Sequence, residues 1–174
     1  MKKILDQQQL SITIKRLSHQ ILENTSEGDD IIIIGIQPRG IYVSDKIVNE
    51  ISRLLPGTKI NYGKLDITFY RDDIRNELHV PNRTDVPFSV ENKRVVLVDD
   101  VLYTGRTIRA ALDALLAFGR PASVELCILI DRRYSRQLPI QPDYTGKSID
   151  SIISQKVKVC WAEKDGKDEV LLMD

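Results

Sequence analysis

The sequence has few of the residues on which several common kinds of site depend. Among its 174 residues are two cysteines and two histidines, and no apolar run approaches the length of a membrane span. Cys127 and Cys160 lie in apolar, strand-like segments, so we expect buried, reduced thiols rather than a disulfide or a metal site. His19 and His79 are isolated and lack the spacing of metal ligands or of a nucleophilic triad.

An excess of charge of one sign is also missing. Lysine plus arginine and aspartate plus glutamate number 25 each, so any basic face for a nucleic acid has to be local. Neither a Walker A sequence nor Gly-x-Gly-x-x-Gly occurs, which excludes the usual nucleotide-binding loops. Asp6 interrupts the only stretch that begins like a signal peptide. We therefore expect a cytoplasmic protein with one domain, residues 1–174.

A strongly apolar segment near the middle of the chain ends in two acidic residues. The run Val95-Val96-Leu97-Val98 predicts a strand that is buried on both faces, as in a parallel sheet. Asp99 and Asp100 follow it directly and are expected at the mouth of the fold. Two carboxylates there suit sugar hydroxyls or the water shell of a metal ion.

The next residues predict a site for an anion. Thr104-Gly105-Arg106-Thr107 opens an amphipathic helix that is expected to run to about Phe118. Gly105 lets the backbone approach a ligand closely. The threonine hydroxyls and the free N–H groups of the first helical turn suit a phosphate monoester. Together with the carboxylates, this turn fits a ribose 5-phosphate.

A second strand–turn–helix unit precedes the first. The strand Ile31–Ile34 leads into Gly35-Ile36-Gln37-Pro38-Arg39-Gly40 and then into a helix from Ile41 to about Leu54. A turn bracketed by glycines with one arginine can bind a diphosphate through backbone N–H groups and a guanidinium. Many turns of this kind are only connections, so the motif is not decisive by itself.

The other segments complete an alternating pattern of strands and helices. We expect a helix over Asp6–Glu23, a third strand over Lys59–Tyr70 and a fourth over Ser123–Ile130. Residues 71–92 are polar and show no periodicity, which is typical of either a lid or a flexible insertion that has no function. Residues 1–25 and 132–174 are expected to form a small hood.

Several blocks in this order resemble a known family. The central segment resembles the phosphoribosyl diphosphate (PRPP) signature of type I phosphoribosyltransferases. Across nearly the full chain, the sequence resembles the pyrimidine operon attenuators that also have uracil phosphoribosyltransferase activity. The resemblance implies an α/β fold with a central, mainly parallel sheet flanked by helices, a small hood and a flexible lid loop. The matching blocks are Gly35–Gly40, Asp66–Asp73, Val95–Thr107, Gly119–Pro121, Leu138–Ile140 and Asp143–Lys147.

The resemblance implies roles for these residues in transfer from PRPP. Asp99 and Asp100 would hold the ribose hydroxyls, or Mg²⁺ through its waters rather than directly. Arg39 would neutralise the pyrophosphate from a loop with a cis peptide bond next to it, and Tyr70 and Arg71 would close over the leaving group from the lid. The remaining substrate-binding residues would be Pro38, Gly40, Val101, Leu102, Tyr103, Thr104, Gly105, Arg106 and Thr107.

One position bears on the base that accepts the ribose. Purine enzymes of this superfamily usually have an acid just before the Thr-Gly pair, where this chain has Tyr103. A tyrosine supplies no carboxylate at neutral pH, which favours uracil, with UMP and pyrophosphate as products. The base would lie under the hood near Asp131, Arg132 and Lys156–Val159, with Val157 among its contacts. A purine or other base transferase without RNA binding remains an alternative, as does a regulator with vestigial catalysis.

The family likeness also implies a partner. Attenuators of this type bind a stem-loop in the leader of pyrimidine messenger RNA, promoted by UMP, with a concave basic face formed across a homodimer or higher oligomer. Lys15, Arg16 and His19 fit such a face, and a solvated helix surface is the alternative. Ser11 and Ile12 stand where more basic residues are usual. The block Asp131–Arg136 is one residue longer than the usual Asp-Arg-Gly pattern.

Overall fold

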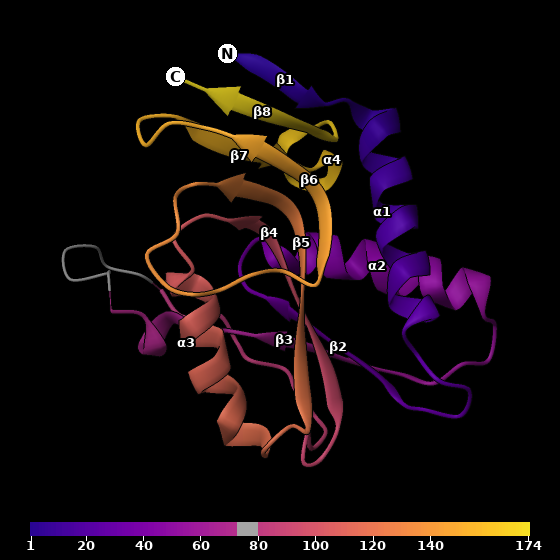
Figure 1. Ribbon diagram of the computed structural model, residues 1–174. Helices are drawn as coiled ribbons and strands as arrows, with labels where there is room; N and C mark the ends of the chain where they lie inside the picture. The colour runs from indigo at the N-terminus through magenta and orange to yellow at the C-terminus, as the bar shows by residue number, and fades with distance from the viewer. Residues whose placement is uncertain (73–79) are drawn as a thin grey trace.

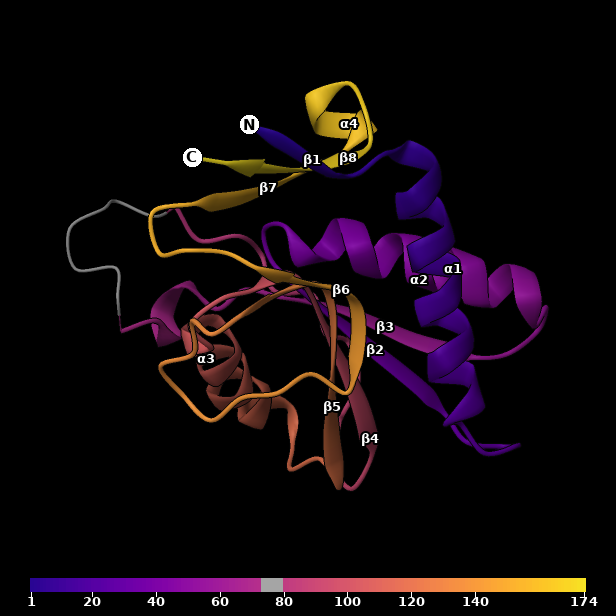
Figure 2. The ribbon, with the colours of Figure 1, turned by 45° about the horizontal axis from the view of Figure 1, so that its top comes forward.

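The structure is a computed structural model that describes residues 1–72 and 80–174. Within these residues, a five-stranded parallel sheet has the order β3-β2-β4-β5-β6, and a three-stranded antiparallel sheet has the order β1-β8-β7. Figures 1 and 2 show the small sheet at one end of the molecule, together with both termini. The elements are β1 (Lys2–Leu5), α1 (Gln7–Glu23), β2 (Ile31–Ile36), α2 (Gly40–Leu54), β3 (Ile60–Leu65), η1 (Thr68–Tyr70), β4 (Arg94–Leu102), α3 (Arg106–Leu115), η2 (Leu116–Phe118), β5 (Ser123–Arg133), β6 (Tyr144–Asp150), β7 (Lys156–Cys160), α4 (Ala162–Asp165) and β8 (Glu169–Met173).

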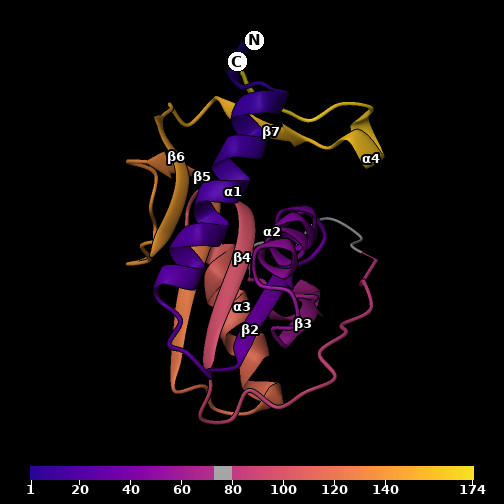
Figure 3. The ribbon, with the colours of Figure 1, turned by 90° about the vertical axis from the view of Figure 1, so that its right-hand side faces the viewer.

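The central strands are apolar on both faces because helices cover both faces of the sheet. Ile31 and Ile33 of β2 point into a core shared with α1 and α2, whereas Ile32 and Ile34 point into a second core shared with α3. Side chains alternate across a strand, so an unbroken apolar run is needed to fill both cores. The predicted parallel sheet with flanking helices is confirmed, and Figure 3 shows α1 and α2 on the same side of it.

The two predicted strand–turn–helix units lie side by side. β2 pairs in parallel with β4, so the loops that follow both strands leave the same edge of the sheet. A Cβ atom on Gly40 would lie 2.6 Å from the carbonyl oxygen of Val98, so only glycine lets α2 begin this close to β4. This packing brings the loop after β2 against the predicted acidic pair.

Two strand boundaries differ from the sequence predictions. β4 does not end before Asp99 but runs to Leu102, because Val101 and Leu102 still pair with β5. β3 ends at Leu65 rather than at Tyr70, since the Asp66 carboxylate accepts a 2.8 Å hydrogen bond from the Thr68 hydroxyl and turns the chain into η1.

The hood is smaller than predicted and is composed differently. We use the name for β1, β7, β8 and α4. β6 lies at the edge of the main sheet, where it pairs with β5, although residues 132–174 were all assigned to the hood. Helix α1 packs mainly against α2 and β6, and its buried face shares one core with residues of the hood. The sequence prediction missed β1, which pairs with β8 from the other end of the chain.

The predicted lid falls partly outside the described residues, since 73–79 are not among them. Its later part is joined to the body of the protein: Asp85 and Lys64 exchange two backbone hydrogen bonds of 2.8 Å each. Val86 and Val90 are buried in the core on the α3 side. Residues 85–90 are therefore a fixed part of the fold.

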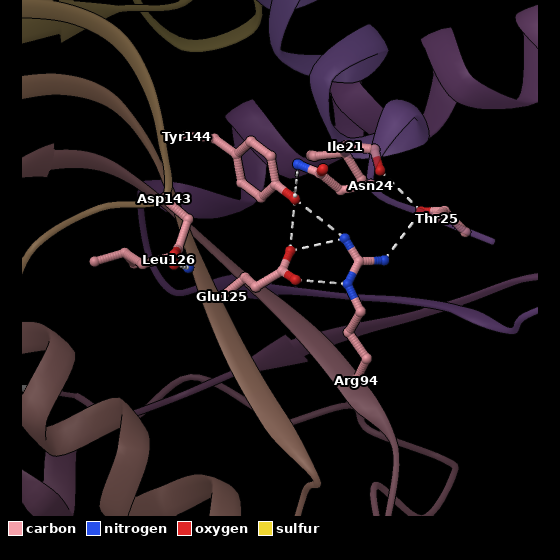
Figure 4. A network of polar contacts seen from close by, with 8 residues as sticks. All are labelled: Ile21, Asn24, Thr25, Arg94, Glu125, Leu126, Asp143 and Tyr144. Atoms are coloured by element: carbon pink, nitrogen blue, oxygen red, sulfur yellow. Dashed lines mark hydrogen bonds and ion pairs between the residues drawn. The ribbon is translucent and has the colours of Figure 1, made fainter.

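A network of polar side chains joins α1 to the amino ends of β4 and β5 (Figure 4). Arg94 donates to both carboxylate oxygens of Glu125 at 2.7 Å, and Tyr144 donates to one of them at 2.6 Å. Arg94 also donates to the Thr25 hydroxyl at 3.0 Å, just beyond the end of α1. Every charged group here has a partner, so we assign the network to stability.

The structure tests the expectation for the two cysteines. Cys127 and Cys160 are free and buried, as predicted. In residues 1–72 and 80–174, no helix has the length and apolar character that crossing a membrane requires. His79 lies outside the described residues.

Candidate functional site

A cavity of about 310 Å³ opens at the start of α3. Gly105 has a φ of 94°, in the left-handed region that glycine adopts without strain, and it turns the chain from β4 into the helix. The first N–H groups of a helix have no partner within the helix and carry the positive end of its dipole. The turn is therefore suited to an anion. The described residues that line the cavity are Arg71, Val101, Leu102, Tyr103, Thr104, Gly105, Arg106, Thr107, Ile108 and Gln137.

Two carboxylates lie side by side just before this turn. Asp99 and Asp100 retain only 6% and 8% of their exposure. The backbone N–H of Asp100 donates to Asp99 Oδ1 at 2.9 Å, and Arg39 Nε donates to Asp100 Oδ2 at 3.3 Å. Arg39 thus pairs with Asp100, whereas the charge of Arg71 acts on Asp99.

Burial and mutual repulsion disfavour the charged forms of both acids. Loss of hydration raises the pKa of Asp99 well above its usual value, and the charge of Asp100 raises it further. Loss of hydration also raises the pKa of Asp100, while Arg39 opposes that rise. An additional positive charge in front of this pair would relieve the repulsion between them.

Arg39 connects the acidic pair to the hood. Its Nη2 donates to the carbonyl oxygen of Val159 in β7 and lies 4.0 Å from Asp165 Oδ2. The predicted loop of Pro38, Arg39 and Gly40 therefore lies between Asp100 and the hood. The cis peptide bond is at Gln37–Pro38, one bond earlier than the prediction of a bond adjoining Arg39.

Arg71 lies between two cavities. It lines the cavity at the start of α3, and it also lines a second cavity, of about 130 Å³, with Gln37 and Pro38. Its charge lowers the pKa of Asp99 against the larger effect of burial. Tyr70 is not among the described residues that line either cavity. Its carbonyl oxygen accepts a 3.2 Å hydrogen bond from Arg109 Nη2. The structure thus brings Arg71, but not the Tyr70 side chain, together with the other predicted residues.

Only some of the residues predicted to contact the base lie beside the α3 cavity. The Arg132 guanidinium lies over the Tyr103 ring, 3.9 Å from its centroid, and donates to the Ser151 hydroxyl at 2.8 Å. Arg132 is 5% exposed, so the stack is a fixed wall beside the α3 cavity. Val157 pairs with Leu172 inside the hood and lines none of the cavities described above.

The three residues predicted to contact RNA do not act alike. Arg16 donates to the carbonyl oxygens of Thr145, at 3.2 Å, and Gly146, and so covers the free edge of β6. Lys15 lines a separate cavity of about 370 Å³ between α1 and α2. His19 is exposed on α1. Arg16 therefore has a structural role that its exposed position on a helix did not reveal.

Sequence reasoning missed the segment behind the α3 cavity. Ser135, Arg136 and Gln137 all make hydrogen bonds to the turn between β4 and α3. The unusual length of the Asp131–Arg136 block is visible in the sequence. The contacts that its residues make depend on the course of the following loop, which the sequence does not determine. Ile108 and Gln137 line the cavity without having been predicted to do so.

The described residues include no group of three or more histidine, cysteine or acidic side chains that could enclose a metal ion. Asp99 and Asp100 still fit a divalent cation, because they are two adjacent buried carboxylates whose charged forms burial disfavours. Mg²⁺ typically retains several waters and uses one or two carboxylates together with substrate oxygens. The donor set thus suits Mg²⁺ brought with a phosphorylated substrate.

A parallel sheet with an anion turn and an acidic pair at its carboxyl edge defines a class of enzyme acting on sugar phosphates. The sequence matches the family described as phosphoribosyl transferase domain over residues 1–164. The chain belongs to this phosphoribosyltransferase family, as its motifs suggested. Within it, the chain belongs with relatives named bifunctional protein PyrR, to which it is 40% and 44% identical over 98% of its length.

The similarity to those proteins covers almost the whole chain. It is 44% identical over 172 residues to the bifunctional protein PyrR of a Picosynechococcus species, covering 98% of this chain and 96% of the relative. Its identity to the protein of the same name from Bacillus cereus strain AH820 is 40% over 175 residues, with the same coverage.

Solved structures confirm the fold alone. The hypoxanthine phosphoribosyltransferase of Trypanosoma cruzi has a TM-score of 0.73 at 15% identity, covering 99% of this chain and 95% of that chain. The enzyme of the same name from Staphylococcus aureus has a TM-score of 0.69 at 23% identity, covering 86% and 78%. The predicted type I phosphoribosyltransferase fold is therefore confirmed.

Proposed function

We propose that the protein transfers the phosphoribosyl group of PRPP to uracil, giving UMP and pyrophosphate. The observation that carries this proposal is that Arg71 lines both the anion cavity at α3 and the neighbouring cavity at Pro38. A single substrate with phosphate groups at both ends would span the two cavities. The acidic pair lies on the strand that leads into the first of them.

The reaction breaks the bond between the anomeric carbon and the pyrophosphate oxygen through an oxocarbenium-like state. The Thr104–Thr107 turn would hold the 5-phosphate, and Asp99 and Asp100 would accept hydrogen bonds from the ribose hydroxyls. Their negative charge also stabilises the positive charge that develops on the ribose ring. Arg71 and Arg39 would stabilise the charge that the leaving pyrophosphate gains. For Arg39 this requires that the guanidinium turn away from Asp100.

Mg²⁺ fits the same arrangement. Asp99 and Asp100 would hold it through its waters, and it would supply positive charge to the ribose hydroxyls and the pyrophosphate when bound. The raised pKa of both acids is consistent with a site completed by a cation.

The choice of uracil is supported by Tyr103. Its ring is stacked under Arg132. Tyr103 and Arg132 would then present a neutral ring and a cation to the base, where purine enzymes present an acid. The two buried free thiols suit the cytoplasmic location that we also propose.

A second activity, binding of a pyrimidine messenger RNA leader promoted by UMP, is part of this proposal. It is supported by the word "bifunctional" in the names of relatives that match over nearly the full chain. Exposed Lys15 and His19 on α1 are available for phosphate contacts, in a homodimer or higher oligomer. Affinity should fall steeply with salt, because such binding rests on phosphate contacts. A gel shift with leader RNA at low salt that shows no complex, with or without UMP, would contradict this part.

A panel of bases tests the enzymatic proposal directly. The protein is incubated with PRPP, Mg²⁺ and uracil, hypoxanthine, guanine or adenine, and nucleotide products are separated by chromatography. We expect UMP from uracil and no product above background from the purines. A purine nucleotide in place of UMP would contradict the assignment of the base, and no product with any base would contradict transferase activity.

A further inference from the structure

The segment from Ser135 to Ile140 lies behind the turn between β4 and α3, and no part of the proposed chemistry uses it. We call it the strap. Its backbone N–H groups at Gln137 and Leu138 donate to the carbonyl oxygen of Thr104 at 2.9 and 3.3 Å. The Gln137 side chain accepts from Arg106 Nε at 2.8 Å. The strap therefore contacts the turn on both sides of Gly105.

Gly105 itself packs against the strap. A Cβ atom at this position would lie 3.2 Å from Ile140 Cδ1 and 3.5 Å from Leu138 Cβ. The glycine allows both the left-handed turn and this close approach. With the strap behind it, the turn has little room to move away from the cavity that it lines.

Arg136 has the most connections of any strap residue. Its Nη1 donates to the carbonyl oxygens of Tyr103, at 2.7 Å, and Arg132, at 3.1 Å. Its Nε donates to the carbonyl oxygen of Ile140 at 2.9 Å, and its Nη2 pairs with Asp131. The side chain is 22% exposed. One guanidinium thus joins the end of β5, the turn and the far end of the strap.

The planar fork of an arginine is well suited to this task. It has five N–H donors in a fixed geometry and no acceptor, so it can hold several carbonyl oxygens at set positions. A lysine can replace one or two of these hydrogen bonds but not all of them. None of these contacts uses an N–H group of the first turn of α3, and residues 104–108 line the cavity.

We propose that Arg136 is a positioning residue for the 5-phosphate site, acting through the Tyr103 carbonyl and the strap on the Thr104–Thr107 turn. This inference rests on the proposed function, because it assumes that the turn binds the phosphate of PRPP. Arg136 itself is not among the described residues that line the cavity. We expect its effect at the phosphate end, since its hydrogen bonds join Asp131, Arg132, Tyr103 and Ile140.

Binding of the two halves of the substrate separates positioning from a general effect on folding. The full-length protein with Mg²⁺ is titrated with ribose 5-phosphate and, separately, with pyrophosphate by calorimetry. For Arg136→Ala we expect the Kd of ribose 5-phosphate to rise about tenfold or more, because small misplacements of binding groups have large effects. The Kd of pyrophosphate should stay within about twofold of the wild-type value.

Two further variants complete the test. Arg136→Lys should recover part of the affinity for ribose 5-phosphate, because an ammonium group can donate to the Tyr103 carbonyl. Arg133→Ala is the matched control: this neighbouring arginine donates to Asp150 and stacks near Tyr134 instead of contacting the turn. If Arg136→Ala does not fold, Arg136→Lys and Arg136→Gln provide the same comparison.

The outcomes are distinct. Unchanged affinity of Arg136→Ala for ribose 5-phosphate would overturn the inference and leave the proposed function standing. An equal loss of affinity for both ligands, with no recovery in Arg136→Lys, would assign the residue to general stability. That result would also overturn the inference. Failure of the wild-type protein to bind either ligand would overturn the proposed function itself, and the positioning role with it.

Discussion

The two ends of β4 hold charged residues in opposite ways. At the amino end, Arg94 and Glu125 meet in a two-point ion pair that Tyr144 and Thr25 complete. At the carboxyl end, Asp99 and Asp100 are adjacent and more deeply buried, and Arg39 makes a single 3.3 Å hydrogen bond to Asp100. Charges of opposite sign stabilise the first region, whereas two charges of the same sign oppose folding in the second.

This difference teaches which end of the strand carries function. A paired charge network needs no ligand to account for it. Two adjacent buried carboxylates are costly in the folded chain, so their presence indicates that something else requires them. In the proposed function, this requirement is the ribose of PRPP and the Mg²⁺ that accompanies it.

The largest expected effect is on activity at the acidic end. Asp100→Asn keeps the shape of the side chain but removes its charge, so we expect the rate of UMP formation to fall by about 100-fold or more. The thermal midpoint should not fall, because the substitution removes a repulsive buried charge. Initial rates at saturating PRPP, together with thermal unfolding, check both. Asp113→Asn, an exposed acid on α3 paired with Arg109, is the control.

At the amino end, we expect the substitution to lower stability rather than activity. Arg94→Met removes both bonds to Glu125 and leaves that acid without its cation, so we expect a loss of about 2–4 kcal/mol of unfolding free energy. For a domain of this length that corresponds to a fall of about 4–16 °C in the thermal midpoint. Urea unfolding at pH 7 measures the change. A variant as stable as the wild type would remove the distinction between the two ends.

The pH dependence of stability gives a smaller but sharper contrast. Burial raises the pKa of Asp99 and Asp100, so between the usual value of about 3.9 and the raised values the folded chain binds more protons than the unfolded chain. Stability contributed by these groups is therefore lost as the pH rises through that range. The Arg94 hydrogen bonds lower the pKa of Glu125, so its contribution is lost as the pH falls instead.

Comparing the wild type with Asp99→Asn/Asp100→Asn isolates the acidic pair. In the absence of divalent cations, the double variant should gain stability relative to the wild type as the pH is raised from 4 to 7. Urea unfolding at several pH values in EDTA provides the measurement. A stability difference that does not change with pH would show that the pair is not strained by burial.

Local patterns predicted the elements that form the site. The unbroken apolar run before Asp99 fixed β4 as a central strand, and the Thr-Gly pair fixed the start of α3. Contacts between distant segments were not predictable in the same way. Residues 144–150 were assigned to the hood, because an edge strand of the main sheet and a hood strand have the same local pattern.

Side-chain partners were the least predictable feature. Arg16 has the sequence context of a solvated helix residue, but its partners are carbonyl oxygens of β6, about 130 positions away. The family resemblance paired Tyr70 with Arg71 at the leaving group, but among the described residues only Arg71 lines the two cavities. Arg136 stood in a block of unusual length, and only the course of the strap shows what it holds.

The rate of UMP formation by Asp100→Asn and Glu125→Gln, measured side by side at 25 °C with PRPP, uracil and Mg²⁺, tests most directly whether the two ends of the sheet differ in this way. We predict a loss of about 100-fold or more for Asp100→Asn and a rate within about twofold of the wild type for Glu125→Gln. Equal losses in the two variants, or an active Asp100→Asn, would contradict the assignment of catalysis to the carboxyl end of β4.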